Sequence, residues 1–561
     1  MLPPPPVRGA YRTDARARAA YAEGAGIYRI LPEAVSRPAD VEDLKTLIAW
    51  ASEHRIPLIP RGAGSAMGGG NVGAGLVVDL TGMSERRLDI DPARRRAVAA
   101  ASVTLAELSA AATPFGLRLP PDPSSGRWAT LGGMVSTNAA GARSVRYGSV
   151  RRWVEELTLV TADGESVKLA RRAAGRVPVH GWGGSGTRPR VDGQALALER
   201  FQRDAAPRIQ AASRLITDRF PKTRKNSSGY ALDAYLASGD LLDLIIGAEG
   251  TLGIVTEVAW RLDEVPAFRA GLRVHLSSLA HLGDVIGALN QYEPSALELL
   301  DRSFLDLLGA DRLSDAGLRS GTEAIVLVEL ERDDPETMQQ SLRGASAAVA
   351  AWAASVDTAY SPPEAEELWS IRHAASPILA GLAESRRSLQ VIEDGCVPVE
   401  RMGDYIAAVR RSAGEHGVPV VMFGHAGDGH LHVNLLQDVS REGWEVSVSR
   451  LFQDVTASVI RLGGTPTGEH GDGRLRAGTL LDTYGPEVLD LFRQVKAAFD
   501  PLGIFNPGII LPSGQPAIER LKVGSGAVPI PGDIQQALRE IELTGGYGRC
   551  RLDLAGEEGL G

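Results

Sequence analysis

Three of the ten histidines stand close together in a stretch rich in glycine. Residues 424–434 read GHAGDGHLHVN, and His425 and His432 flank a Gly-Asp-Gly turn that can fold them toward each other. About 35 residues later, Glu469 and His470 lie between further glycines. An isolated histidine is more often a core or surface residue than a ligand. Two imidazoles and one carboxylate in such a cluster, however, suit a divalent metal that keeps one position open.

Four glycine-rich segments occur in the first half of the chain: residues 61–70, 120–125, 132–141 and 247–256. Glycine admits positive φ and lets the main chain approach a ligand closely. Successive N–H groups can then form a concave site for an anion such as pyrophosphate. Any one segment could be an ordinary turn, and none is the G-x-G-x-x-G sequence of a Rossmann site. Four together favour a large cofactor that carries phosphate.

The first glycine segment is predicted to lie between alternating helices and strands. Asp40 is placed as the N-cap of a helix with apolar residues at helical spacing: Val41, Leu44, Leu47, Ile48 and Ala51. Apolar runs at residues 57–60 and 75–80 predict strands before and after the loop.

Three later regions differ in composition. Residues 165–195 have weak periodicity and are interpreted as a surface loop or insertion. The glycine segments stop near residue 263, after which runs such as residues 324–330 predict buried strands of another domain. The tail after Pro512 has one helical pattern, at residues 534–541, and is expected to pack loosely or to meet a partner.

The composition excludes several classes of protein. A chain of 561 residues with 44% hydrophobic and 23% charged residues should form two to four folded domains. The formal charge of -9 argues against a general nucleic-acid binder. Cys396 and Cys550 alone cannot build a disulfide framework or an iron–sulfur site. Without a signal-like apolar region or a membrane-length run, we expect a cytoplasmic protein, at most peripheral at the inner face of the membrane.

Residues 60–64, 121–125, 132–141, 147–148 and 249–256, in this order, resemble the FAD-binding domain of the vanillyl-alcohol oxidase superfamily. Within it, the chain is most similar to the FAD-linked oxidase branch of D-lactate dehydrogenases, glycolate oxidase and D-2-hydroxyglutarate dehydrogenases. The resemblance runs from about residue 27 to residue 511. It implies an α+β fold, in which a two-subdomain FAD-binding domain is joined to an α+β substrate (cap) domain and a helical C-terminal segment.

The resemblance also implies domain boundaries. We expect an N-terminal arm (1–35), an FAD-binding domain (36–262), a substrate domain with the metal site (263–497), a return to the flavin (498–511) and a tail (512–561).

The glycine segments imply the FAD contacts. Residues 61–65 and 132–141 would carry the pyrophosphate. The full set of expected cofactor-binding residues is Arg61, Gly62, Ala63, Gly64, Ser65, Pro121, Asp122, Ser125, Gly132, Gly133, Ser136, Thr137, Asn138, Gly141, Tyr147, Glu249, Gly250, Gly253, Ile254, Val255 and Asn506. Some members attach FAD through a histidine in the first loop. Ser65 stands at that position here, so noncovalent FAD is expected.

The late histidine cluster is similar to the metal motif of the family. The resemblance places the metal ligands, with zinc as the expected metal, at His425, His432 and Glu469, and the general base at His470. His430 departs from the pattern, because asparagine is common there, so a contact of His430 with metal or substrate stays open. In the implied reaction, His470 removes the proton of the metal-bound substrate hydroxyl and hydride passes to flavin N5.

The expected substrate is a small D-2-hydroxy acid. Residues 368–373 resemble the segment that supplies a carboxylate-binding arginine, which falls on Arg372, and Ser376 lies one helical turn further on. Dicarboxylate enzymes of the family carry a lysine just before the motif at residues 394–398. This chain has Ile392 and Glu393 there, which favours lactate or glycolate over 2-hydroxyglutarate.

Alternative functions remain open at this stage. The fold also hosts flavin-dependent alkyl-glycerone-phosphate synthases, which are transferases, and the chain could be a noncatalytic FAD-binding subunit of a larger oxidoreductase. As a dehydrogenase it would pass electrons to a quinone, an electron-transfer flavoprotein or a separate iron–sulfur subunit. The sequence allows a homodimer without requiring one.

Overall fold

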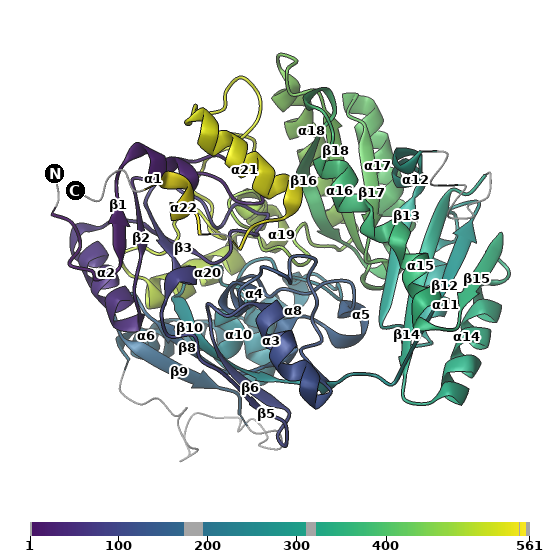
Figure 1. Ribbon diagram of the computed structural model, residues 1–561, viewed down its shortest axis with the longest axis horizontal. Coiled ribbons are helices and arrows are strands. Elements are labelled where there is room, and N and C mark those ends of the chain that lie inside the picture. Colours follow the sequence, from purple (N-terminus) through teal and green to yellow (C-terminus); the bar gives the residue numbers. More distant parts are fainter. Residues whose placement is uncertain (1–2, 173–194, 310–312, 314–320, 549, 557–561) are drawn as a thin grey trace.

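The computed structural model describes residues 3–172, 195–309, 313, 321–548 and 550–556. Helices and strands alternate along it. Sheets of four, five and two strands belong to the first half of the chain, and a sheet of seven strands, drawn in teal and green, stands beside them (Figure 1). The yellow C-terminal helices return to lie beside the purple N-terminal elements (Figure 1).

The first sheet has the strand order β1-β2-β4-β3. β1 is antiparallel to β2, and the other strands are parallel. Their bounds are Ala10–Arg12 (β1), Ala34–Arg37 (β2), Leu58–Arg61 (β3) and Leu76–Asp79 (β4). β1 thus lies within the residues expected to form an arm and extends the sheet.

Helix α2 (Val41–His54) connects β2 to β3 and confirms the predicted cap. The Asp40 side chain accepts a hydrogen bond from the backbone N–H of Asp43 at 2.9 Å. Leu44, Leu47 and Ile48 are fully buried against the sheet, as their helical spacing indicates. The first glycine loop therefore starts from the carboxyl end of a strand that α2 holds in place.

The second sheet is antiparallel, with the order β5-β6-β10-β8-β9. Its bounds are Leu88–Asp91 (β5), Arg96–Ala100 (β6), Val154–Val160 (β8), Ser166–Ala170 (β9) and Ile254–Arg261 (β10). β9 corrects the prediction of a loop over residues 165–195. Val167 and Leu169 are buried and Ser166 and Lys168 are exposed, as in a strand with one solvated face. Residues 173–194 of that prediction lie outside the described residues.

The cap sheet has seven antiparallel strands in the order β15-β12-β14-β13-β17-β18-β16. Their bounds are Phe268–Leu276 (β12), Ala296–Asp301 (β13), Ala324–Arg332 (β14), Ser355–Ala359 (β15), Arg387–Cys396 (β16), Val420–Gly424 (β17) and His430–Gln437 (β18). The turn between β17 and β18 is the Gly-Asp-Gly turn of the histidine motif, so this hairpin places the motif at the end of two inner strands of the sheet.

Helices cover both faces of the cap sheet. One face packs against α11 (Leu282–Asn290), α14 (Pro335–Val349), α17 (Met402–His416) and α18 (Trp444–Arg461). The other face packs against α12 (Arg302–Leu308), α15 (Pro362–His373) and α16 (Ala375–Ala380). The second set includes Arg372, which α15 presents near the hairpin.

The chain returns to the first half before the expected boundary at residue 498. Helix α20 (Pro486–Phe499) buries Val488, Phe492 and Phe499 in the core that the second sheet forms with its helices. This return closes the first domain with residues from the end of the chain.

The expectation of a loosely packed tail is wrong. Helix α21 (Gly532–Thr544) buries Ile534, Leu538 and Ile541, and it packs against α1 (Ala15–Ala20) of the N-terminal region. A small core joins Ile534 and Leu538 to β2, β3 and β4. The amphipathic pattern at residues 534–541 therefore marks a docked helix.

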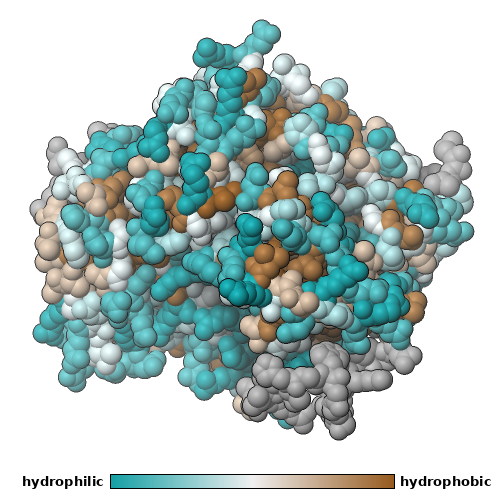
Figure 2. All heavy atoms as spheres, turned by 180° about the vertical axis from the view of Figure 1, so that it is seen from behind, coloured by the Kyte–Doolittle hydropathy of each residue, from teal (hydrophilic) through white to brown (hydrophobic). Residues whose placement is uncertain are grey.

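The surface is mixed in character. In the view from behind, hydrophobic side chains form separate patches among hydrophilic ones (Figure 2). Within the described ranges, we find no helix with both the length and the apolar character that crossing a membrane requires.

Candidate active site

A cavity of about 910 Å³ lies where the two halves and the tail meet. Its lining falls into three groups. The first half contributes the glycine segments, the cap contributes His425, His432, Glu469, His470 and Arg372, and the tail contributes residues such as Arg539 and Tyr547. Most of the residues that the sequence singles out for a cofactor, and all three that it singles out for a metal, thus share one space.

The first glycine loop has several backbone N–H groups without an acceptor among the described residues. The backbone N–H groups of Gly62, Ala63, Gly64 and Ser65 donate no hydrogen bond to any described residue, although all four residues line the cavity. A Cβ atom on Gly62 would come within 2.4 Å of Thr130 Oγ1. This close approach and the row of unpaired amides fit the pyrophosphate of FAD.

Arg61 supports this loop from beneath. Its buried guanidinium donates to the backbone oxygens of Glu23 at 2.9 Å, Asn71 at 3.3 Å and Tyr21 at 3.4 Å. Gly64, at φ +82°, would direct a Cβ into this same guanidinium. We therefore assign Arg61 to shaping the loop.

Most of the expected cofactor residues line the cavity. They are Arg61, Gly62, Ala63, Gly64, Ser65, Asp122, Ser125, Gly132, Gly133, Ser136, Thr137, Gly141, Glu249, Gly250, Gly253, Ile254 and Val255. Glu249 accepts hydrogen bonds from the N–H of Gly473, and burial together with Asp472 raises its pKa to about 8.

Four expected cofactor residues, Pro121, Asn138, Tyr147 and Asn506, do not line the cavity. The Tyr147 hydroxyl donates to Glu331 at 2.5 Å instead. Asn138 ends a helix in the left-handed conformation. The Asn506 amide donates to the backbone oxygens of Gly70 and Glu249, so Asn506 supports the lining from behind.

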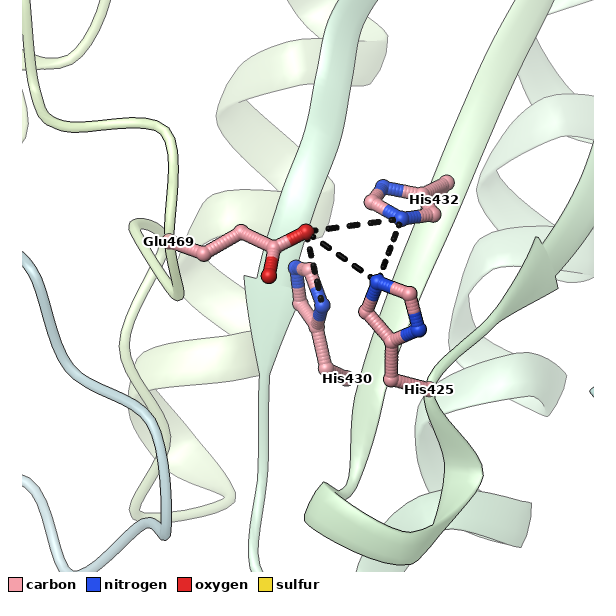
Figure 3. Close-up of side chains that lie close together, drawn as sticks. All are labelled: His425, His430, His432 and Glu469. Carbon is pink, nitrogen blue, oxygen red and sulfur yellow. Dashed lines mark hydrogen bonds and ion pairs between the residues drawn. The ribbon is translucent and has the colours of Figure 1, made fainter. Parts of the chain in front are cut away.

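The histidine cluster converges on one carboxylate oxygen (Figure 3). Glu469 Oε1 lies 3.1 Å from His425 Nε2, 3.8 Å from His432 Nε2 and 3.9 Å from His430 Nδ1. The two Nε2 atoms of His425 and His432 are 3.4 Å apart. Two atoms bound tetrahedrally at ~2.1 Å from one ion would stand at about this separation, so the donor set fits a divalent metal.

Hydrogen bonds on the far side of each ring fix which nitrogen faces the cluster. His432 Nδ1 donates to the backbone oxygen of Glu393 at 2.7 Å, and His425 Nδ1 bonds to Glu298. Such partners orient metal-binding imidazoles and set their tautomers. Burial lowers the pKa of His432, which favours the neutral form that can bind a metal.

His430 is the fourth member of the group. Its Nε2 bonds to Asp394 at 3.0 Å, and its buried Nδ1 has no hydrogen-bond partner among the described residues. The three imidazoles and Glu469 each offer a ligand atom within 4.8 Å of the others. The sequence left open whether His430 contacts the metal or the substrate. Its position inside the cluster makes it a candidate metal ligand.

Two donors hold the second carboxylate oxygen of Glu469, Oε2. Lys225 Nζ lies 2.7 Å from Oε2, and the backbone N–H of Gly141 donates to the same oxygen at 3.1 Å. Burial opposes ionisation of Glu469, but Lys225 and His425 outweigh it and hold its pKa well below the usual range. The carboxylate is therefore ionised and ready to act as a ligand.

His470 lies beside the cluster and also lines the cavity. Its Nδ1 bonds to Glu393, which also accepts a hydrogen bond from Arg476 at 2.9 Å. Burial would lower the His470 pKa, but Glu393 and Asp394 raise it to about 10. With Nδ1 engaged, Nε2 is the ring nitrogen left to act, and it lies 3.6 Å from Glu469 Oε1.

Arg372 completes the polar wall. Its Nε donates to Glu298 at 2.8 Å, and the guanidinium carbon lies 4.7 Å from the centre of the Phe423 ring. Glu298 thus contacts both Arg372 and His425. The side chain of Ser376, the neighbouring prediction, lies outside the described residues.

Two family models match the chain. The one described as FAD binding domain matches residues 32–170, and the one described as FAD linked oxidases, C-terminal domain, matches residues 265–510.

Named relatives match most of the chain. The glycolate oxidase subunit GlcD of Bacillus subtilis (strain 168) is 30% identical over 86% of this chain and 89% of its own length. A D-lactate dehydrogenase of Archaeoglobus fulgidus is 29% identical over 85% of this chain and 91% of its own length. A D-2-hydroxyglutarate dehydrogenase of Escherichia coli (strain K12) is 27% identical over 93% of this chain, which spans only 53% of that relative.

Solved structures confirm the fold. A 4-ethylphenol oxidase from Gulosibacter chungangensis superposes with a TM-score of 0.61 at 15% identity, over 90% of this chain and 94% of that one. An alkyldihydroxyacetonephosphate synthase superposes with a TM-score of 0.56 at 15% identity, over 89% of this chain and 82% of that one. The expected α+β architecture with its FAD-binding domain is correct.

Proposed function

The chain belongs to the FAD-linked oxidase family, and from this premise we propose that it is an FAD-dependent dehydrogenase that converts a small D-2-hydroxy acid to the 2-oxo acid. One observation carries the proposal. The first glycine loop, Arg372 and four residues of the histidine region all line the same cavity; those four are His425, His432, Glu469 and His470. A cofactor held by the loop and a substrate held by the cluster would therefore meet.

Each polar residue has a distinct part in this proposal. Arg372 would bind the substrate carboxylate, since a guanidinium matches the planar shape of that group. His425, His432 and Glu469 would hold the metal, which we propose is zinc, with His430 as a neighbouring donor. When bound, FAD supplies the two-electron acceptor and the metal supplies a Lewis acid.

His470 would take the proton of the substrate hydroxyl at Nε2. The hydrogen bond from Nδ1 to Glu393 fixes the ring and leaves Nε2, 3.6 Å from Glu469 Oε1, as the nitrogen that could accept the proton. The pKa of about 10 corresponds to a protonated imidazole. A cation held by the adjacent ligands would disfavour a second positive charge and would lower the His470 pKa toward the range that a general base requires.

A monocarboxylate such as lactate or glycolate fits the site better than a dicarboxylate. Glu393 is engaged by His470 and Arg476, and Ile392 is buried and carries no charge. Neither residue can supply the lysine that dicarboxylate enzymes of the family place just before residues 394–398.

A substrate panel tests the proposal. The purified protein is mixed without oxygen with D-lactate, L-lactate, glycolate and D-2-hydroxyglutarate, and loss of the flavin absorbance is followed. We expect bleaching by D-lactate or glycolate that stops after metal chelation and returns on addition of Zn²⁺. If the flavin is bound but none of these acids bleaches it, the proposal is wrong, and a transferase or a noncatalytic FAD-binding subunit becomes the better interpretation.

A further inference from the structure

Lys225 reaches the metal cluster from the other half of the molecule. It lies in the loop that precedes α9 (Leu232–Ser238) of the FAD-binding half, and its side chain is only 4% exposed. Its shortest contact, at 2.7 Å, is with Glu469 Oε2, while the carboxylate of Asp428 is 3.6 Å away. Its ammonium also donates to the backbone oxygen of Gly141 at 3.4 Å.

The two oxygens of Glu469 have different surroundings. Oε2 is occupied by Lys225 and by the N–H of Gly141. Oε1 instead faces nitrogens of four histidines, the nearest of which is His425 Nε2 at 3.1 Å. A carboxylate with one oxygen capped by two donors can offer only the other oxygen to an ion.

We propose that Lys225 is a positioning residue of the metal centre, which holds Glu469 as a ligand through the single oxygen Oε1. The inference rests on the metal site of the proposed function and adds a residue that the sequence did not single out. A merely structural ion pair could be formed with Asp428, which already accepts a hydrogen bond from Ser144 at 2.6 Å. Lys225 lies nearer to the ligand.

Without Lys225, the Glu469 side chain could rotate or bind through both oxygens. Partners that orient metal ligands typically contribute ~10–100-fold to metal affinity. We therefore expect Lys225→Met to weaken Zn²⁺ binding by a factor in this range. Because the number of carboxylate oxygens on the ion would change, the visible spectrum of bound Co²⁺ should change as well.

The experiment uses the full-length flavoprotein stripped of metal. Zn²⁺ affinity is measured by competition with a chromophoric chelator, and Co²⁺ spectra are recorded for wild type, Lys225→Met and Lys222→Met. Lys222 is an exposed lysine on the same loop, so its variant should match wild type in both measurements. Flavin content and melting temperature show which variants are folded.

The outcomes separate the two proposals. Wild type that binds neither ion refutes the metal centre itself. Wild type that binds Zn²⁺ while folded Lys225→Met stays within about twofold of it, with an unchanged Co²⁺ spectrum, overturns the role of Lys225. Should Lys225→Met fail to fold, X-ray absorption of Zn²⁺-loaded wild type decides: one carboxylate oxygen is expected, and a carboxylate bound through both oxygens contradicts the inference.

Discussion

Among single residues, the buried carboxylate of Glu298 connects the two ends of the proposed substrate site. One oxygen contacts His425 and the other accepts from Arg372 at 2.8 Å. Burial opposes ionisation, but His425 and Arg372 outweigh it and lower the Glu298 pKa. A metal ligand and the residue proposed to bind the substrate carboxylate therefore keep a fixed relative position.

The role of His470 is testable at this scale. We expect His470→Ala to keep the flavin spectrum and to slow flavin reduction by substrate ~10²–10⁴-fold, as is typical when a general base is removed. Stopped-flow absorbance measures the rate. His281→Ala is the matched control, because His281 is an exposed histidine that pairs with Asp284 and does not line the cavity. Reduction at the wild-type rate would remove His470 from the mechanism.

The spacing of residues in the sequence predicted only those members of the site that lie close together along the chain. Four glycine-flanked residues could be predicted to gather, and they line one cavity: His425, His432, Glu469 and His470. His430 could have been added, because it shares with His432 the period-two face of β18. Lys225 and Glu298 could not, since each contacts the cluster across more than 100 residues of chain without a local pattern.

At the scale of elements, β14 is joined to the FAD-binding half through Glu331. This fully buried carboxylate accepts hydrogen bonds from Arg118 at 2.8 Å and from Tyr147 at 2.5 Å. Burial alone would raise its pKa, but Arg118, Tyr147 and Arg143 lower it to about 2. The network holds the cap sheet to the domain that carries the glycine loops.

We expect Glu331→Gln to destabilise the protein by ~3–5 kcal/mol, because it leaves the mostly buried guanidinium of Arg118 without its carboxylate partner. The pH dependence follows from the lowered pKa. A depressed folded-state pKa stabilises the fold above the ordinary glutamate value of ~4.3, and this stabilisation is lost as the pH falls toward about 2.

Melting temperatures of wild type and Glu331→Gln between pH 7 and pH 3 measure this effect. The difference between them should be largest at neutral pH and should shrink below about pH 4. Glu336→Gln, on the exposed start of α14, is the control. A difference that stays constant across this range would contradict the assignment.

Local signals predicted some elements better than others. The Asp40 cap and the apolar spacing of α2 were sufficient, because both are contained in 15 neighbouring residues. β9 was missed although Val167 and Leu169 alternate with polar residues. Its strand is only five residues long, and its partner β8 supplies the hydrogen bonds that define it.

At the scale of the whole molecule, the docked tail forms one wall of the cavity. Arg539, Glu542 and Tyr547 line it, and Glu542 forms ion pairs with Arg387 and Lys522 at 2.8 and 3.1 Å. The sequence showed an amphipathic helix at residues 534–541 but not its partner, since α1 lies more than 500 residues earlier in the chain. Global docking of this kind has no local signature.

We expect a chain that ends at Pro531 to hold FAD at least about tenfold more weakly, because one wall of the cavity is lost and the apolar face of α1 is exposed. Fluorescence titration of the flavin-free protein with FAD measures the affinity. Ile534→Asp in the full chain, which should undock α21 without removing it, is the companion variant. Unchanged FAD affinity in both would show that the tail is not part of the cofactor site.

Gly141 stands at the junction of the two binding regions. Its N–H donates to Glu469, and the segment that it ends is expected to carry the cofactor phosphates. Binding of FAD that orders this segment would also order Glu469 and so raise the affinity for the metal. By thermodynamic linkage, binding of the metal would then raise the affinity for FAD by the same factor. Removal of the metal should then weaken FAD binding, and removal of FAD should weaken metal binding. In a partly loaded preparation, most molecules would therefore contain both FAD and metal or neither of them.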